Sequence, residues 1–197
     1  MTDFARLMSD YFVKYLAGQK GSGSNTMKTY RDTFVQLLEF MDEKKHIRAD
    51  CIEVDSFSYD IINEFLEYLE KEKRVSISTR NNRLAAIRSF FKYTGYHEPK
   101  YLNISTSIRE ISKKKTEGRQ MNYLSVNAME HFLNSFDKTD HKELRCFCIV
   151  LLLYESGARV TELCNVRRYD LHLEKPYTMI LHGKGDKIRS VPLDGLV

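Results

Sequence analysis

The sequence predicts a mainly helical protein in two parts: a four-helix domain over residues 1–104 and an incomplete α+β domain over residues 121–197. Three observations predict this fold class. Amphipathic helical patterns follow one another through the first part. A basic stretch without a core-forming period occupies residues 105–120. Beyond Asp170 the pattern changes to β-strands around a glycine-rich turn, which indicates a small hairpin.

The first two helices are predicted from apolar residues that recur every three or four positions. A glycine- and serine-rich loop at residues 18–24 separates them, and the second helix begins near Asn25. The first apolar stripe consists of Phe4, Leu7, Met8, Tyr11, Phe12, Tyr15 and Leu16, and the second of Met27, Tyr30, Phe34, Leu37, Leu38 and Met41. Both stripes are expected to be buried.

Two more helices complete the predicted bundle. The fourth runs from about Ser78 to Tyr93. The third buries Ile61, Ile62, Phe65, Leu66 and Leu69, and the fourth buries a narrow stripe of Leu84, Ile87 and Phe91. Because the connections are brief, the four helices are expected to pack as a compact bundle.

The stretch over residues 105–120 is interpreted as a basic interdomain linker. It contains the triplet Lys113–Lys115, and its basic residues outnumber its acidic ones. A solvated loop is the alternative, because such charge runs usually face water. Its position between two differently patterned parts of the chain favours the linker.

The second part begins with helices and ends with strands. Ser125 is a predicted N-cap for a helix that carries Met129, Phe132 and Leu133. A long apolar helix follows over about residues 142–155, Gly157 ends it, and a short helix begins near Val160. Strands are predicted at Tyr177–Leu181 and Ile188–Leu193, around the turn Gly183–Asp186.

Composition excludes few classes of function. Hydrophobic residues make up 42% and charged residues 29% of the chain, and its net charge of +4 is compatible with nucleic acid without requiring it. The longest apolar run, Cys146–Tyr154, is too short to span a bilayer and predicts a buried helix. With no signal-peptide pattern visible, a cytoplasmic protein without a membrane partner is expected.

The four cysteines are expected to be buried structural thiols. Cys146 and Cys148 lack the spacing of zinc ligands, and with Cys164 they fall in apolar helical patterns, whereas Cys51 stands apart. No metal site is therefore predicted.

Two stretches carry a resemblance to a known family. Residues Ser78–Tyr93 resemble the last long helix of the core-binding domain in phage-integrase and Xer-like tyrosine recombinases. Residues Tyr154–Leu163 and Gly183–Leu193 resemble the start of their catalytic domain, with its segment Gly-x-Arg-x-x-Glu-Leu followed by Gly-Lys-Gly-x-Lys-x-Arg-x-x-Pro-Leu. The resemblance implies a SAM-like core-binding domain joined to a catalytic domain of which only the first part is present.

The resemblance also implies a function: site-specific DNA recombination, including the integration of mobile elements. Such enzymes cleave one strand with a tyrosine, hold it as a 3′-phosphotyrosyl link, and rejoin it without metal or cofactor. The implied partner is duplex DNA carrying a recombination site, and the full-length protein is expected to self-associate on it. A type IB topoisomerase relative shares the chemistry, but the compact first domain disfavours it.

By resemblance, three residues belong to the active site. Arg159 would present paired donors to a phosphate, which suits a guanidinium. Glu162, one helical turn later, would support Arg159, although a plain surface pair explains this spacing equally well. Lys184, between two glycines, would protonate the leaving 5′-oxygen. A surface arginine and an ordinary turn lysine are the alternatives for the other two.

The DNA-binding surface is predicted mainly on the fourth helix. Asn81, Arg88 and Lys92 form one polar stripe with Ala85 in its middle, where a small residue lets the helix approach the DNA backbone and Asn81 meet a base edge. The remaining candidates are Arg80 and Arg83 beside the stripe, Thr26, Lys28 and Arg31 at the start of the second helix, and Lys187 and Arg189 on the hairpin. A solvated charged face is the alternative reading.

Several residues of the family pattern are missing. No His-x-x-Arg segment follows Leu193, and all twelve tyrosines precede the hairpin turn Gly183–Asp186, so none is assigned as the nucleophile. Arg168 also stands where the family often has tryptophan. The 197 residues are therefore expected to be a fragment that does not cleave DNA by itself. The rival hypothesis is a non-catalytic DNA-binding protein, an accessory factor or a competitor, derived from a recombinase.

Overall fold

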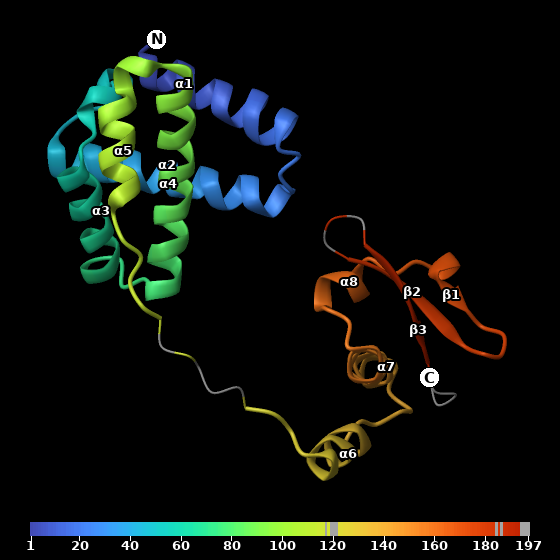
Figure 1. Ribbon diagram of the computed structural model, residues 1–197. Coiled ribbons are helices and arrows are strands. Elements are labelled where there is room, and N and C mark those ends of the chain that lie inside the picture. The colour runs from blue at the N-terminus through green and yellow to red at the C-terminus, as the bar shows by residue number, and fades with distance from the viewer. Residues whose placement is uncertain (117, 119–121, 184, 186, 194–197) are drawn as a thin grey trace. The chain divides into compact units, whose positions relative to one another are not determined.

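The computed structural model describes residues 1–116, 118, 122–183, 185 and 187–193. The chain divides into two compact units, Met1–Arg119 and Gln120–Val197, which are described separately. Figure 1 shows the first unit as helices and the second as helices beside a small sheet. This is the mainly helical fold class with a small sheet that the sequence predicts.

The predicted helices of the first unit are confirmed, each with slightly different ends. Serine or threonine caps begin three of them, because the hydroxyls of Thr2, Ser58 and Ser76 each accept a backbone N–H of the first turn. The main helices are α1 (Asp3–Asp10), which continues as the π-helical η1 (Tyr11–Gln19), α2 (Ser24–Lys45), α3 (Tyr59–Lys71) and α4 (Ile77–His97). Short 3-10 turns lie at η2 (Ala49–Cys51), η3 (Val54–Ser56) and η4 (Pro99–Tyr101).

The core of this unit is centred on aromatic side chains of α4. The ring of Phe90, which the predicted stripe did not include, lies 5.3–5.5 Å from the rings of Phe4, Tyr11, Phe34 and Phe91. Edge contacts of this kind add to the stability gained by burial. Helix α4 therefore buries a wider face than predicted and packs against several elements of its unit.

A fifth helix, α5 (Leu102–Glu110), corrects the predicted start of the linker at residue 105. Ser105 and Ile108 are buried against α4, and the Ser105 hydroxyl donates to the Phe91 carbonyl at 2.6 Å. The helices approach so closely that a β-carbon on Gly95 would lie 2.6 Å from the Ser105 side chain. Residues 105–111 thus belong to the helical unit, because its core extends to Ile111.

The second unit follows the predicted order of elements. Ser125 caps α6 (Val126–Asn134), and Gly157, with a φ of 58°, ends α7 (His141–Ser156). After α8 (Val160–Cys164) and η5 (Arg168–Asp170), the antiparallel strands β1 (Leu171–His172), β2 (Thr178–His182) and β3 (Ile188–Pro192) pair in that order. The hairpin is confirmed, and β1 is an additional strand.

The expected burial of α7 and of the cysteines is wrong. Within α7 only Leu151 is buried among the described residues, and Ile149 and Tyr154 are 41% and 51% exposed. Cys51, Cys146 and Cys164 are exposed, and Cys148 is half-buried. The physical reason is local: each of the other described helices and strands of the second unit has nine residues or fewer, and together they leave most of the α7 side chains accessible. Over the described residues, no helix is long and apolar enough to cross a membrane.

Candidate functional site

The candidate active site is built at the start of α8. Arg159 is the N-cap residue of this short helix, directly after the turn that ends α7. Its backbone N–H donates to Glu162 Oε2 at 2.9 Å, and its guanidinium Nη1 donates to Glu162 Oε1 at 2.8 Å. The Arg159 side chain is nevertheless 73% exposed. One edge of the guanidinium is therefore held by Glu162 while most of the side chain faces solvent.

Glu162 is the buried centre of this cluster, with only 4% of its side chain exposed. A second arginine, Arg189 on β3, donates from Nη2 to Glu162 Oε2 at 2.8 Å. The Arg189 guanidinium, the backbone N–H of Arg159 and the Arg159 guanidinium lower the pKa of Glu162 to about 2 against the effect of burial. The carboxylate therefore stays ionised at neutral pH.

The base of the β2–β3 hairpin lies beside the same carboxylate. A β-carbon on Gly183 would lie 3.2 Å from Glu162 Oε1 and 3.3 Å from the Lys187 carbonyl, which accepts the Gly183 N–H at 2.7 Å. Lys184, the predicted general acid, lies outside the described residues, whereas Lys187 is exposed. Arg159, Glu162 and Arg189 are thus brought together, and the residue before Lys184 adjoins them.

A second buried carboxylate, Asp170, was missed from the sequence. It is 4% exposed, accepts the Arg167 N–H at 2.8 Å and lies 3.1 Å from His182 Nε2, at the end of β2. The Arg167 backbone N–H, followed by His182, holds the pKa of Asp170 below its usual value. Arg167 and Asp170 are three residues apart, a capping spacing that was visible in the sequence. The pairing of Asp170 with His182 was not visible, because it forms only when β2 folds back beside η5.

Arg80, predicted to face DNA, is instead a buried structural residue. Its Nε lies 3.0 Å from Glu70 Oε1 on α3, and its Nη1 donates to the Ser112 carbonyl at 3.3 Å. Only 5% of the residue is exposed. The expectation fails because the bundle surrounds Arg80 with α3 and with the chain that follows α5.

Asn81 and Arg83 are also engaged within the first unit. The Asn81 amide donates to the Lys114 carbonyl at 2.8 Å and accepts the Lys114 N–H at 3.1 Å. Arg83 donates to the Thr29 carbonyl at 3.0 Å and to the Thr33 hydroxyl at 3.3 Å, so it connects α4 to α2. The predicted contact of Asn81 with a base edge would require it to leave Lys114.

The other predicted DNA-binding residues of the first unit are accessible. Lys28, Arg31 and Lys92 are exposed, and Arg88 and Thr26 are half-buried. An open hollow of about 290 Å³ lies between the start of α2 and α4, and Thr26 and Ala85 both line it. Its lining consists of Asn25, Thr26, Thr29, Tyr30, Asn82 and Ala85.

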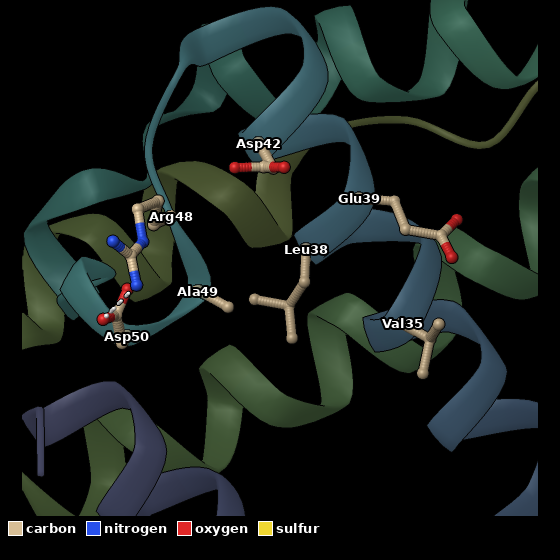
Figure 2. A pocket seen from close by; sticks show the side chains of 7 residues that line it. All are labelled: Val35, Leu38, Glu39, Asp42, Arg48, Ala49 and Asp50. Carbon is tan, nitrogen blue, oxygen red and sulfur yellow. Dashed lines mark hydrogen bonds and ion pairs between the residues drawn. The ribbon is translucent and has the colours of Figure 1, made fainter.

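Another hollow, of about 570 Å³, lies between α2 and η2 and does not fit an anionic ligand (Figure 2). Its lining includes three acidic side chains, Glu39, Asp42 and Asp50, and one basic side chain, Arg48, which pairs with Asp50 at 3.0 Å. This net negative charge repels phosphate. Among the described residues, no three histidine, cysteine or acidic side chains are grouped so that they could hold a metal ion.

Comparison with known proteins gives matches along most of the chain. Residues 10–99 match the phage integrase N-terminal SAM-like domain, and residues 122–195 match the phage integrase family. The chain is 29% identical over 190 residues to a Sinorhizobium fredii protein named integrase/recombinase y4rD, covering 96% of this chain and 68% of the relative. It is 30% identical over 189 residues to the tyrosine recombinase XerD of Listeria innocua, covering 93% and 59%.

A solved structure has a similar fold. The Tn1549 transposon integrase, in complex with transposon right end DNA, aligns with 99% of this chain and 62% of its own length, with a TM-score of 0.65 and 19% identity. The chain thus spans about 60% to 70% of the length of these proteins.

Proposed function

Because the chain belongs to the phage integrase family of tyrosine recombinases, we propose that it serves site-specific DNA recombination, in which a strand is cleaved and rejoined through a phosphotyrosyl intermediate. Its two units supply different parts of that function. The helical unit holds duplex DNA, and the second unit presents cations to the phosphate that reacts.

The observation that carries this proposal is the state of Arg159. A cation that binds a reacting phosphate must be fixed in direction and yet open to the ligand. Arg159 meets both conditions, since Glu162 holds its Nη1 and its backbone N–H while 73% of the side chain is exposed. A guanidinium held in this way offers its remaining donors to two phosphate oxygens.

Lys184 is proposed as the general acid for the leaving 5′-oxygen. The support is the family motif, together with the position of Gly183 next to the Glu162 carboxylate. An ammonium group loses its proton far more readily than a guanidinium, which suits proton transfer. No described residue is proposed as the nucleophile, and we propose that a tyrosine outside these 197 residues supplies it.

Duplex DNA is the proposed partner, and the transposon integrase of similar fold was solved in complex with transposon right end DNA. The proposed contacts of the helical unit are Arg88 and Lys92 on α4 together with Thr26, Lys28 and Arg31 on α2. Arg80 and Arg83 act indirectly, because their guanidinium groups fix α3 and α2 to α4. Assembly of several copies on the recombination site is part of the proposal.

The test is duplex DNA binding by the 197-residue chain, measured by fluorescence anisotropy over a range of salt concentrations. Arg88→Glu combined with Lys92→Glu should weaken binding to all sequences and reduce the slope of log affinity against log salt by roughly two, because each lost phosphate contact removes about one released counterion. Arg48→Glu, in the acidic hollow, is the control and should have little effect. Absence of duplex binding at low salt would refute the proposal.

A non-catalytic DNA-binding protein is the alternative, and it makes the same prediction for binding. The reading frame after Val197 separates the two, because only the enzyme needs it to continue into a His-x-x-Arg segment and a tyrosine. A suicide substrate, nicked so that a cleaved strand stays linked to the protein, tests whether these 197 residues cleave DNA by themselves. The 197-residue chain should form no covalent complex with it. Covalent capture at one of the twelve tyrosines would show that the nucleophile lies within this chain.

A further inference from the structure

Glu162 presents an electrostatic problem for the proposed role of Arg159. A carboxylate that orients an arginine also neutralises it, so an isolated Arg159–Glu162 pair carries no net charge with which to attract a phosphate. The structure holds a second cation on the same carboxylate, since Arg189 Nη2 lies 2.8 Å from Glu162 Oε2. With both arginines charged and Glu162 ionised, the cluster of Arg159, Glu162 and Arg189 keeps one positive charge.

Both arginines donate hydrogen bonds to the Glu162 carboxylate. Arg159 donates its guanidinium to Oε1 and its backbone N–H to Oε2, and Arg189 donates to Oε2 from the opposite element, β3. Their exposure differs as well, because 73% of the Arg159 side chain is exposed but only 40% of the Arg189 side chain. Arg159 is therefore the member of the cluster that is open to a ligand, and Arg189 is the more enclosed one.

We propose that Arg189 is a positioning residue, which acts through Glu162 to keep Arg159 oriented and the cluster positively charged. This inference rests on the proposed function. It differs from the sequence expectation that Arg189 itself contacts DNA, because the contact seen in the structure is with Glu162.

Arg189 also connects the hairpin to α8. It pairs across the ladder with Leu181, two residues before Gly183, whose missing side chain leaves room for Glu162 Oε1. The Glu162–Arg189 ion pair thus fixes the position of β2 and β3, the two strands of the hairpin, relative to α8 and Arg159. An ammonium in place of Arg189 keeps the charge but lacks the planar fork that fixes direction, so lysine should substitute only in part.

The test follows two NMR signals of the full 197-residue chain: the Glu162 side-chain carboxyl carbon during a pH titration, and the Arg159 Nε–H during titration with inorganic phosphate. In Arg189→Met the Glu162 pKa should rise from about 2 towards its usual 4.5, and phosphate affinity at Arg159 should fall about fivefold. Arg189→Lys should give intermediate values. Arg168→Met removes the same charge from an exposed site of the second unit and should change neither signal.

A double-mutant cycle distinguishes action through Glu162 from direct binding by Arg189. In a Glu162→Gln background Arg189 has no carboxylate to act through, so removing Arg189 should lower phosphate affinity less than it does in the parent chain. An undiminished effect there would overturn the inference, as would an unchanged Glu162 titration in folded Arg189→Met or Arg189→Lys. If phosphate leaves the parent Arg159 signal unmoved, the proposed function of Arg159 fails, and the Glu162 titration still decides whether Arg189 acts on Glu162.

Discussion

Arg80 and Arg88 lie eight residues apart on α4 and were both predicted to contact DNA, yet their environments differ. Arg80 is buried between Glu70 and the Ser112 carbonyl, whereas Arg88 is half-buried and keeps access to solvent. Their spacing along the helix does not reveal this difference, because the partners of Arg80 lie ten and thirty-two residues away in sequence. Only the packing of other elements against one side of α4 separates a buried arginine, bonded within the protein, from one that keeps access to solvent.

The contrast predicts opposite effects of the same substitution. Arg80→Met should lower the free energy of unfolding of the first unit by about 2 kcal/mol, because it leaves the partly buried Glu70 carboxylate without its guanidinium. Arg88→Met should change it by less than about 0.5 kcal/mol, as is usual for accessible positions, while weakening DNA binding. Urea denaturation followed by circular dichroism measures the first effect. Equal destabilisation by both variants would contradict this assignment.

Glu162 makes the second unit sensitive to acid. Its pKa is lowered from 4.5 to about 2, so the stability contributed by the ionised carboxylate is complete above about pH 4.5 and is lost as pH falls towards 2. The chemical shift of the Arg159 amide, which donates to Glu162, should report this loss over that interval. Glu162→Gln should abolish the transition, and Glu174→Gln, at an exposed position, should leave it intact. A transition that persists in Glu162→Gln would assign it to another group.

At the scale of elements, the end of the helical unit differs most from the sequence prediction. The stretch interpreted as linker begins inside α5, and after Ile111 it continues without regular secondary structure as a segment bonded to α4 through Asn81. Asn81 pairs with both backbone polar groups of Lys114, and the Lys114 ammonium lies 2.7 Å from Glu70. One of the lysines that suggested a free linker, Lys114, thus binds the segment to the helical bundle.

This attachment should be sensitive to one side chain. Asn81→Ala removes the acceptor for the Lys114 N–H, so that amide should lose its protection against hydrogen exchange, and trypsin should cleave faster after Lys113 and Lys115. Asn82→Ala, at the exposed neighbouring position, is the matched control. If Lys114 remains as protected in Asn81→Ala as in the parent chain, the side-chain pairing does not hold this segment.

At the scale of the whole molecule, the two units differ in how much apolar surface they bury. The first unit has a continuous cluster of buried side chains drawn from all its main helices. Among the described residues of the second unit, the buried apolar side chains are Leu151, Met179 and Leu181. Large apolar side chains on its helices remain open to solvent, namely Val126, Phe132, Leu144, Ile149, Tyr154 and Val160.

The units should therefore differ in local stability. Because burial of apolar surface is the main favourable term in folding, the slowest amides of α4 should outlast those of α7 in hydrogen exchange by at least about tenfold. Exchange monitored by mass spectrometry on the 197-residue chain measures this ratio. Comparable protection of α7 would mean that its exposed apolar face is covered, and the oligomeric state of the sample would then have to be determined.

The sequence by itself determined what depends on neighbouring residues. Helical stripes such as Phe4–Leu16, the Ser125 cap, the stop at Gly157 and the hairpin around Gly183 all follow from short-range periodicity and backbone preference. The family was likewise recognisable from contiguous motifs around Arg159 and Lys184. The three-residue spacing of Arg159 and Glu162 made their contact foreseeable, although it left its meaning open.

Only the tertiary structure decided which polar side chains remain available for a ligand. The pairings of Glu162 with Arg189, of Arg80 with Glu70 and of Asn81 with Lys114 join residues from different elements. No local pattern encodes such pairs, because each forms only when packing brings distant segments within hydrogen-bonding reach. Because Arg80 and Glu162 are buried, leaving either of them unpaired is costly. Through these three pairings, Arg80, Asn81 and Arg189, which were predicted to contact DNA, are bonded within the protein.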